Sequence, residues 1–218
     1  MAMNNIVIDD IRTFLAQPRT IPFMNERDLQ MHLAIFLTAT THYDRVEVEY
    51  YVPKIALGSG YVWKNEMKVD IVIEKSGEYI PIELKFKTRE IPGINIDRFG
   101  EVLKGVQIVK NQSAHNEAKY AFWKDVRRIE LLKKRFPSAI KNGVVLFLTN
   151  DYSYQMPQKL MDAKSASHSV AEGSHFNERS ALKESMPAFM LFNSYTIKWS
   201  GKLDKINPTI FEYILLKI

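Results

Sequence analysis

The chain contains no cysteine, which excludes disulfide bonds, thiolate metal ligands and a cysteine nucleophile. None of its apolar runs approaches the ~18 residues that a membrane-spanning helix requires. The opening residues, MAMNNIVIDD, lack the basic start and apolar stretch of a signal peptide. These absences predict a cytoplasmic protein with no membrane partner.

Two kinds of ligand site are also missing. No glycine-rich phosphate loop precedes a predicted helix, which argues against an NTPase. The five histidines show no metal spacing, and His168 and His175 are seven residues apart in a predicted loop. We therefore expect no zinc site.

What remains is an ordinary globular composition. The chain has 218 residues, of which 46% are hydrophobic and 25% charged, enough to bury one substantial core. We therefore expect a single domain over residues 1–218. The formal net charge is +5 and the pI is about 9.2, a mild bias toward a polyanionic partner that decides nothing alone.

The order of predicted elements indicates an α/β fold. Residues 26–40 have a helical apolar stripe with Asn25 as N-cap. A strand (46–52) and a hairpin (67–87) follow, then an amphipathic helix (116–135) and a wholly apolar strand (143–149). Helices packed on a mixed central sheet account for this order.

The remaining segments are less regular. Residues 88–115 are rich in turns. Residues 150–187 have no steady period and predict a long loop or insertion, and residues 188–218 contain terminal strands at 195–199 and 210–218. The predicted core of the domain is therefore about residues 20–150.

The hairpin MKVDIVIEKSGEYIPIELKFK places two acids side by side. Counting outward from the Ser76-Gly77 turn pairs Val72 with Pro81 and brings Asp70 opposite Glu83. Like charges placed so repel each other. Such a pair requires a cation between the two groups or a proton on one of them.

Two further acids fall on apolar helix stripes. Glu26 precedes Leu29 on the stripe of the first predicted helix, and Asp125 lies between Phe122 and Ile129 on the second. Glu26 as an ordinary first-turn acid, and Asp125 held by Arg127 or Arg128, remain open alternatives. Taken with the hairpin, these inward acids predict an oxygen-ligand site for Mg²⁺ or Mn²⁺.

Asp70, the step to Glu83, and the run Glu83-Leu84-Lys85 resemble the PD-(D/E)XK nuclease superfamily, with the restriction-endonuclease-like fold. The resemblance covers about residues 20–150 and includes the order of elements, αβββαβ. Val69 stands where the family name has proline, a position that varies freely in the family.

The resemblance implies a role for each matched residue. Asp70, Glu83 and the Leu84 carbonyl would hold Mg²⁺, Glu26 would complete the metal shell directly or through water, and Lys85 would orient or deprotonate the attacking water. Gln112 and Tyr120 would touch water or phosphate, although turn-facing and core-packing roles are at least equally open for both.

Weaker signals concern nucleic acid. Aromatic residues Tyr61, Trp63 and Trp123 are candidates for base stacking or for the core. Basic residues that are candidates for a phosphate-binding groove are Lys87, Arg89, Lys104, Lys110, Lys124, Arg127, Lys133, Lys134 and Arg135.

The sequence thus predicts a Mg²⁺-dependent nuclease that hydrolyses phosphodiester bonds in DNA. Pairing into a homodimer is left open. Two rivals remain: a non-catalytic nucleic-acid-binding or complex-assembly protein that keeps the fold, and an interaction module in which Asp70 and Glu83 are surface charges.

Overall fold

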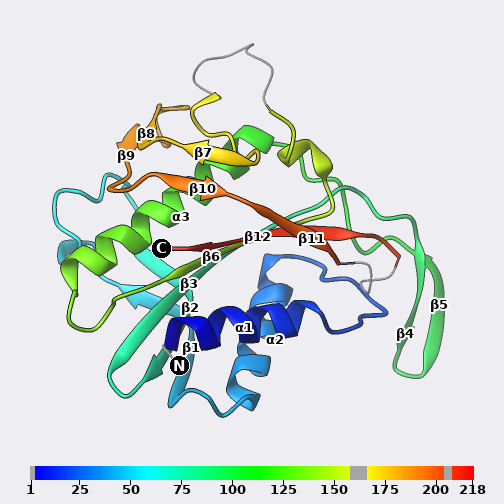
Figure 1. The fold of residues 1–218 in the computed structure, drawn as a ribbon. Helices are drawn as coiled ribbons and strands as arrows, with labels where there is room; N and C mark the ends of the chain where they lie inside the picture. The colour runs from blue at the N-terminus through cyan, green and yellow to red at the C-terminus, as the bar shows by residue number, and fades with distance from the viewer. Residues whose placement is uncertain (1–2, 158–165, 204–207) are drawn as a thin grey trace.

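A computed structural model describes residues 3–157, 166–203 and 208–218 of the chain (Figure 1). Residues 158–165, which belong to the predicted loop at 150–187, lie outside the described residues. No helix in the described ranges has both the length and the apolar character needed to cross a membrane.

A six-stranded sheet forms the centre of the fold, in the order β1-β2-β3-β6-β12-β11. Only β3 and β6 run parallel, and the other neighbours are antiparallel. The predicted mixed α/β architecture is therefore confirmed. The bounds are Arg45–Val52 for β1, Met67–Lys75 for β2, Glu78–Lys87 for β3, Val144–Thr149 for β6, Phe211–Lys217 for β12 and Trp199–Leu203 for β11.

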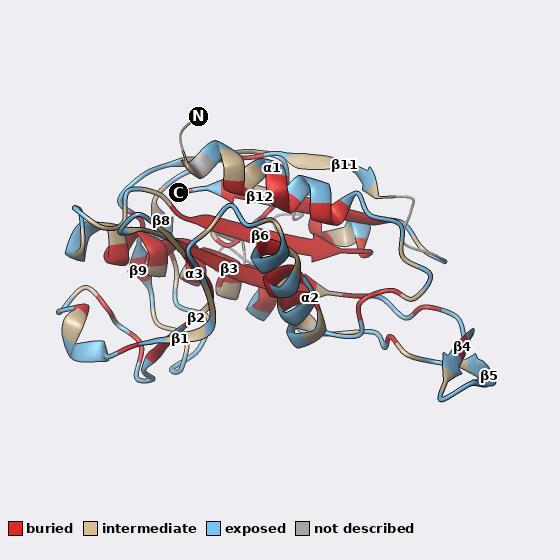
Figure 2. Cartoon of the chain, turned by 90° about the horizontal axis from the view of Figure 1, so that it is seen from below, coloured by how far each residue is buried: buried red, intermediate tan, exposed pale blue. Residues whose placement is uncertain are grey.

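Helices cover both faces of this sheet (Figures 1 and 2). On one face α1 (Met3–Leu15) and α2 (Glu26–Ala39) pack against alternate residues of β2 and β3, in one apolar cluster. On the other face α3 (His115–Arg135) packs in a second cluster. The predicted helices at 26–40 and 116–135 are confirmed within one residue, whereas α1 was not predicted.

The N-terminus of α2 shows why this helix begins where it does. The Asn25 side chain accepts a hydrogen bond from Asp28 N at 2.8 Å, which satisfies a backbone donor that the helix leaves free. Leu29, Leu33 and Leu37 are buried on the stripe toward the sheet. The cap and the stripe fix where Glu26 and Gln30 lie relative to β3.

The predicted hairpin register is confirmed from Lys75–Glu78 to Ile71–Ile82. Ser76 and Gly77 both have positive φ, at 52° and 79°, as a two-residue hairpin turn of this twist requires. The ladder ends there, one residue short of the predicted Asp70–Glu83 pair.

One facial assignment is wrong. Strand alternation predicts Val69 on the same face as Ile71, but Val69 packs in the α3 cluster and Ile71 in the α1–α2 cluster. Alternation breaks at Asp70, which lies opposite Glu49, a β1 residue with a left-handed φ of 53°. Because helices cover both faces, Val72 is also buried on the α3 side.

Two segments that the sequence left irregular contain strands. Residues 88–115 include a hairpin of β4 (Ile94–Arg98) and β5 (Glu101–Val106) that stands out from the body (Figures 1 and 2). Between β6 and β11, the described residues pack over α3 in the second apolar cluster. The elements there are the 3₁₀ turn Tyr152–Tyr154, β7 (Gly173–His175), β8 (Glu178–Arg179), β9 (Phe189–Met190) and β10 (Tyr195–Ile197).

Candidate functional site

Lys85 lies at the centre of the predicted acids. Its Nζ is 2.9 Å from Asp125 Oδ2 on α3 and 3.4 Å from Glu26 Oε1 on α2. The same ammonium donates to the carbonyl of Leu84 at 2.6 Å. Burial alone would lower the pKa of Lys85, but the carboxylates around it, Asp125 foremost, raise it above its usual value. Lys85 is therefore a charged group, and its side chain is only 13% exposed.

Glu26 joins α2 to the strand that bears Lys85. Besides the Lys85 contact, its Oε2 accepts a hydrogen bond from Phe86 N at 2.9 Å. The side chain is 38% exposed, so Glu26 is half-buried at the edge of the site rather than inside the apolar stripe.

Asp70 occupies the position at which the β2–β3 ladder would continue. Its Oδ2 accepts from Leu84 N at 2.6 Å, and its backbone carbonyl accepts from Gln30 Nε2 at 2.6 Å. Burial raises the pKa of Asp70 to about 6, against the opposing effect of Lys85. Gln30 was missed by sequence reasoning, although it lies one helical turn after Glu26.

Glu83 is the most deeply buried acid, at 1% exposure. Burial raises the pKa of this carboxyl well above its usual value, against the effect of Arg128. Arg128 Nη1 lies 3.2 Å from Glu83 Oε1, yet that oxygen has no hydrogen bond of acceptable geometry among the described residues.

Arg128 also binds Asp125, at 3.0 Å, and donates to the carbonyl of Lys68. The alternative that Arg128 holds Asp125 is thus confirmed, and Lys85 holds the same carboxylate from the other side. Burial would raise the pKa of Asp125, but Lys85 and Arg128 outweigh it and lower this pKa.

We call these six residues, which come from α2, β2, β3 and α3, the carboxylate cluster: Glu26, Asp70, Glu83, Asp125, Lys85 and Arg128. If every acid were ionised, the four carboxylates of the cluster would outnumber its two cations, and the nearby Lys124, which interacts with Asp125 and Glu83, would offset part of this negative excess. Burial is the main cause of the raised pKa values of Asp70 and Glu83, and the neighbouring carboxylates add to it. A divalent cation carries the charge that is missing, and carboxylate oxygens are the donors that Mg²⁺ prefers.

The arrangement is not that of a preformed metal cage. Within the described ranges, no three carboxylate, imidazole or thiol side chains are gathered so that they could hold one ion. The reason is visible in the ion pairs: Lys85 separates Glu26 from Asp125, and Arg128 separates Glu83 from Asp125. The Leu84 carbonyl is bonded to Lys85. Metal binding would require these cations to shift.

A cleft opens at the cluster. Its volume is about 310 Å³, and it is lined by Glu26 and Lys85, by Lys87 at the end of β3 and by residues of the first turns of α3. Asp70, Glu83 and Asp125 are not part of its lining. A reacting group in this cleft would therefore meet Lys85 and Glu26 first.

The two accessory candidates lie in different surroundings. Gln112 is half-buried beside the β3 exit, its backbone N donates to Thr88 O at 2.9 Å, and its Oε1 is buried without a partner among the described residues. Tyr120 is 1% exposed in the core. Its hydroxyl accepts from Trp63 Nε1 and donates to Pro187 O, both at 2.8 Å. Tyr120 therefore packs in the core, as the core-packing alternative predicted.

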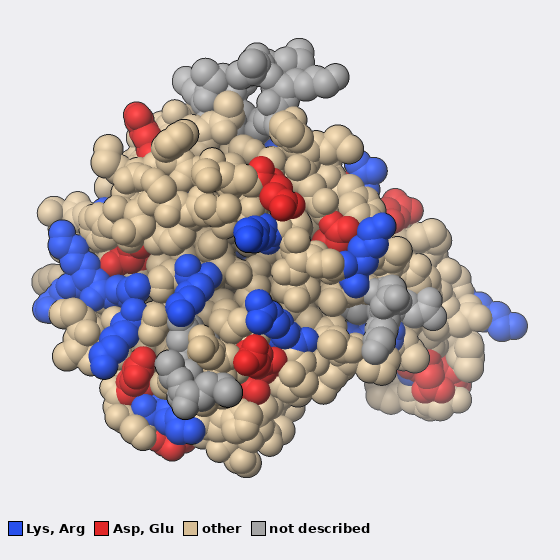
Figure 3. All heavy atoms as spheres, in the orientation of Figure 1, with Lys and Arg blue, Asp and Glu red and all other residues tan. Residues whose placement is uncertain are grey.

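The residues proposed for base stacking and phosphate binding can also be located in the structure. Tyr61, Trp63 and Trp123 are all buried, so these rings are core residues and stacking on bases is excluded for them. Arg127 is buried and paired with Glu130. On the face seen in Figure 3, basic and acidic side chains are interspersed and form no continuous basic stripe.

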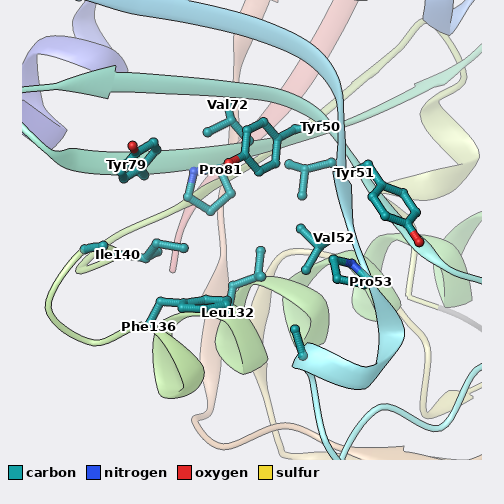
Figure 4. Close-up of a pocket in the computed structure, with 13 residues that line it drawn as sticks. Tyr50, Tyr51, Val52, Pro53, Val72, Tyr79, Pro81, Leu132, Phe136 and Ile140 are labelled. Atoms are coloured by element: carbon teal, nitrogen blue, oxygen red, sulfur yellow. The ribbon is translucent and has the colours of Figure 1, made fainter.

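A second cavity, of about 330 Å³, lies at the far end of α3 (Figure 4). Leu132 of α3 and Phe136, the residue that follows α3, face Val72 and Pro81 of the hairpin across it, and Tyr50 lies at one side. It contains none of the carboxylate cluster, and its lining is almost wholly apolar.

Comparisons with known proteins gave no match to a family model, to a curated protein or to a solved structure. The assignment of function therefore depends on the geometry of the site.

Proposed function

We propose that the chain is a Mg²⁺-dependent nuclease of the PD-(D/E)XK type that hydrolyses phosphodiester bonds in DNA. The observation that carries the proposal is the carboxylate cluster: acids from four elements, α2, β2, β3 and α3, gather around one buried, charged lysine that lines a cleft, and carboxylates outnumber cations there.

Each residue has a defined part in this proposal. Asp70, Glu83 and the Leu84 carbonyl would hold the ion, and Glu26 would complete its shell directly or through water. Bound Mg²⁺ would supply Lewis acidity and lower the pKa of a coordinated water. Lys85, which stays protonated, would orient the attacking water and stabilise negative charge on the phosphate. Asp125 would position Lys85 through their 2.9 Å contact.

The direct test is cleavage of plasmid, linear and branched DNA with and without Mg²⁺ or Mn²⁺. Lys85→Ala and Asp70→Asn should abolish metal-dependent cleavage. Lys64→Ala, which removes an exposed lysine that does not line the cleft, should cleave like the wild type. Full activity in Lys85→Ala would overturn the proposal.

The alternative is a non-catalytic nucleic-acid-binding or complex-assembly protein of the same fold. The observation in its favour is that Arg128 and Lys85 already engage Glu83, Asp125 and the Leu84 carbonyl. DNA binding that is independent of Mg²⁺, with no cleavage of any substrate, would favour this alternative.

A further inference from the structure

The projecting hairpin ends in a fully exposed aromatic ring. Phe99 stands at the tip of the β4–β5 hairpin with its whole side chain in solvent, and Val102 and Leu103 on β5 are also exposed. The hairpin makes a separate two-stranded sheet that no other strand of the described residues extends. Such apolar exposure on one projecting element is typical of a contact surface.

The backbone at the tip makes Phe99 an unfavourable choice for folding. Phe99 and Gly100 form a two-residue loop between the paired residues Arg98 and Glu101, and both have positive φ, at 58° and 84°. A turn of this kind favours Asn-Gly, and left-handed φ is unfavourable for a bulky residue. An exposed, strained phenylalanine stabilises nothing in the isolated chain, which points to a role in binding.

The hairpin is anchored at the candidate site. Lys87, seven residues before β4, and Ala114, eight residues after β5, both line the cleft beside Lys85. Between them the two stems are joined by Gln112 N to Thr88 O at 2.9 Å and by Ile91 N to Val109 O at 3.3 Å. Ile91 and Val109 are buried in the α1–α2 cluster, so a fixed base carries the exposed tip.

The charge of the arm indicates which part of a nucleic acid it would meet. Residues 94–106 contain two acids, Asp97 and Glu101, and two bases, Arg98 and Lys104. With no net charge, the arm gains little from the phosphate backbone. An apolar side chain on such an arm contacts base steps, where inserted Phe, Leu or Met unstacks neighbouring pairs.

We propose that Phe99 is a wedge that inserts between base pairs of duplex DNA held at the Lys85 cleft, so that the protein selects duplexes that are easily unstacked. This inference rests on the proposed function, because it takes the nucleic acid to lie in that cleft. A mismatched or nicked step has lost part of its stacking and would accept the ring at lower cost.

The test compares binding of a matched duplex with that of the same duplex carrying one central mismatch, with EDTA present so that Mg²⁺-dependent cleavage cannot occur. With Phe99 present we expect the mismatched duplex to bind about tenfold more tightly. Phe99→Asn should bring the ratio close to one, and it should fold at least as well because Asn-Gly suits the turn. Phe99→Leu should keep part of the preference, and Ile55→Ala, which removes another exposed apolar side chain, should keep all of it.

The outcomes are separable. Mg²⁺-dependent cleavage that requires Lys85, together with equal mismatch ratios in Phe99 and Phe99→Asn chains, would overturn the wedge and leave the nuclease standing. If the wild type neither cleaved nor bound duplex DNA, both the nuclease and the wedge proposals would be overturned. A shift from dimer to monomer in Phe99→Asn by sedimentation, with unchanged DNA binding, would assign the tip to a second copy and overturn the wedge.

Discussion

Lys85 and Asp125 form an ion pair between β3 and α3, with 2.9 Å between Nζ and Oδ2. Both side chains are almost excluded from solvent, at 13% and 3% exposure. Each charge depends on the other, since an unpaired charge in such surroundings is strongly unfavourable. The pair therefore links the stability of the fold to the protonation of the residue that we place at the centre of the chemistry.

Replacement of Asp125 by Asn should lower the free energy of unfolding. The variant keeps the shape but leaves Lys85 and Arg128 with less compensation, and removing one partner of a buried pair costs about 3 kcal/mol. Urea unfolding should show this as a lower midpoint with an unchanged slope. Asp97→Asn, on the exposed hairpin, is the matched control and should unfold like the wild type. An unchanged midpoint in Asp125→Asn would contradict the buried pair.

Replacement of Tyr120 by Phe separates a core role from a site role. The change removes the hydrogen bonds to Trp63 Nε1 and Pro187 O, and leaving such buried groups unpaired costs about 1–3 kcal/mol. We expect lower thermal stability with unchanged kcat/KM per folded molecule. The opposite pattern, normal stability with impaired cleavage, would show that the hydroxyl acts on substrate.

Glu130 should hold the segment after β6 on α3. Its carboxylate accepts from Phe192 N at 2.7 Å, Asn193 N at 2.9 Å and the Tyr195 hydroxyl at 2.9 Å. Glu130→Ala leaves these donors unpaired, so amide hydrogen exchange should quicken at residues 192–195 and stay slow in β3. Glu178→Ala, which removes an exposed acid in β8, is the control. Equal exchange rates at residues 192–195 in Glu130→Ala and in the wild type would contradict this anchoring.

Local patterns carried most of the fold prediction. The hairpin register followed from the two-residue turn and strand alternation, and α2 followed from its Asn25 cap and leucine stripe. The error at Val69 arose because alternation assumes a regular strand, whereas the chain departs from regularity opposite Glu49. α1 was missed because residues 1–10 were considered only as a possible signal peptide, and the helical spacing of the buried Val7, Ile11 and Phe14 was not recognised.

The site was predictable as a set of residues but not as a network. Spacing brought Asp70 and Glu83 together, and the Asp125–Arg128 pair follows from helical geometry. The pairing of Lys85 with Asp125 and the approach of Arg128 to Glu83 depend on how α3 crosses the sheet. No local pattern encodes that crossing.

His168 should make the fold sensitive to acid. Burial, with Arg179 nearby, lowers the pKa of His168 to about 4, against the effect of the Ser180 carbonyl. Because the folded pKa lies below the unfolded value of 6.5, stability is complete above about pH 6.5 and falls as pH decreases toward 4. The loss should be about 1–2 kcal/mol, allowing for partial solvation.

Urea midpoints between pH 7.5 and pH 4.5 measure this loss. His168→Gln retains a donor for Ser180 O, which His168 Nε2 meets at 2.7 Å, and cannot titrate, so its midpoint should fall less over the same range. Parallel pH profiles for the two proteins would exclude His168 as the source.

Mg²⁺ should stabilise the folded chain through Asp70. A ligand that binds only the folded state adds about 1.4 kcal/mol at tenfold its Kd, so the thermal midpoint should rise with Mg²⁺ and, similarly, with Mn²⁺. Asp70→Asn keeps an acceptor for Leu84 N, the 2.6 Å bond of the wild type, but removes a negative charge from the carboxylate cluster. Its midpoint should therefore be insensitive to the metal, whereas Asp97→Asn should respond like the wild type. If Asp70→Asn were stabilised as much as the wild type, the metal would bind elsewhere, and the cluster would lose the charge argument on which its role depends.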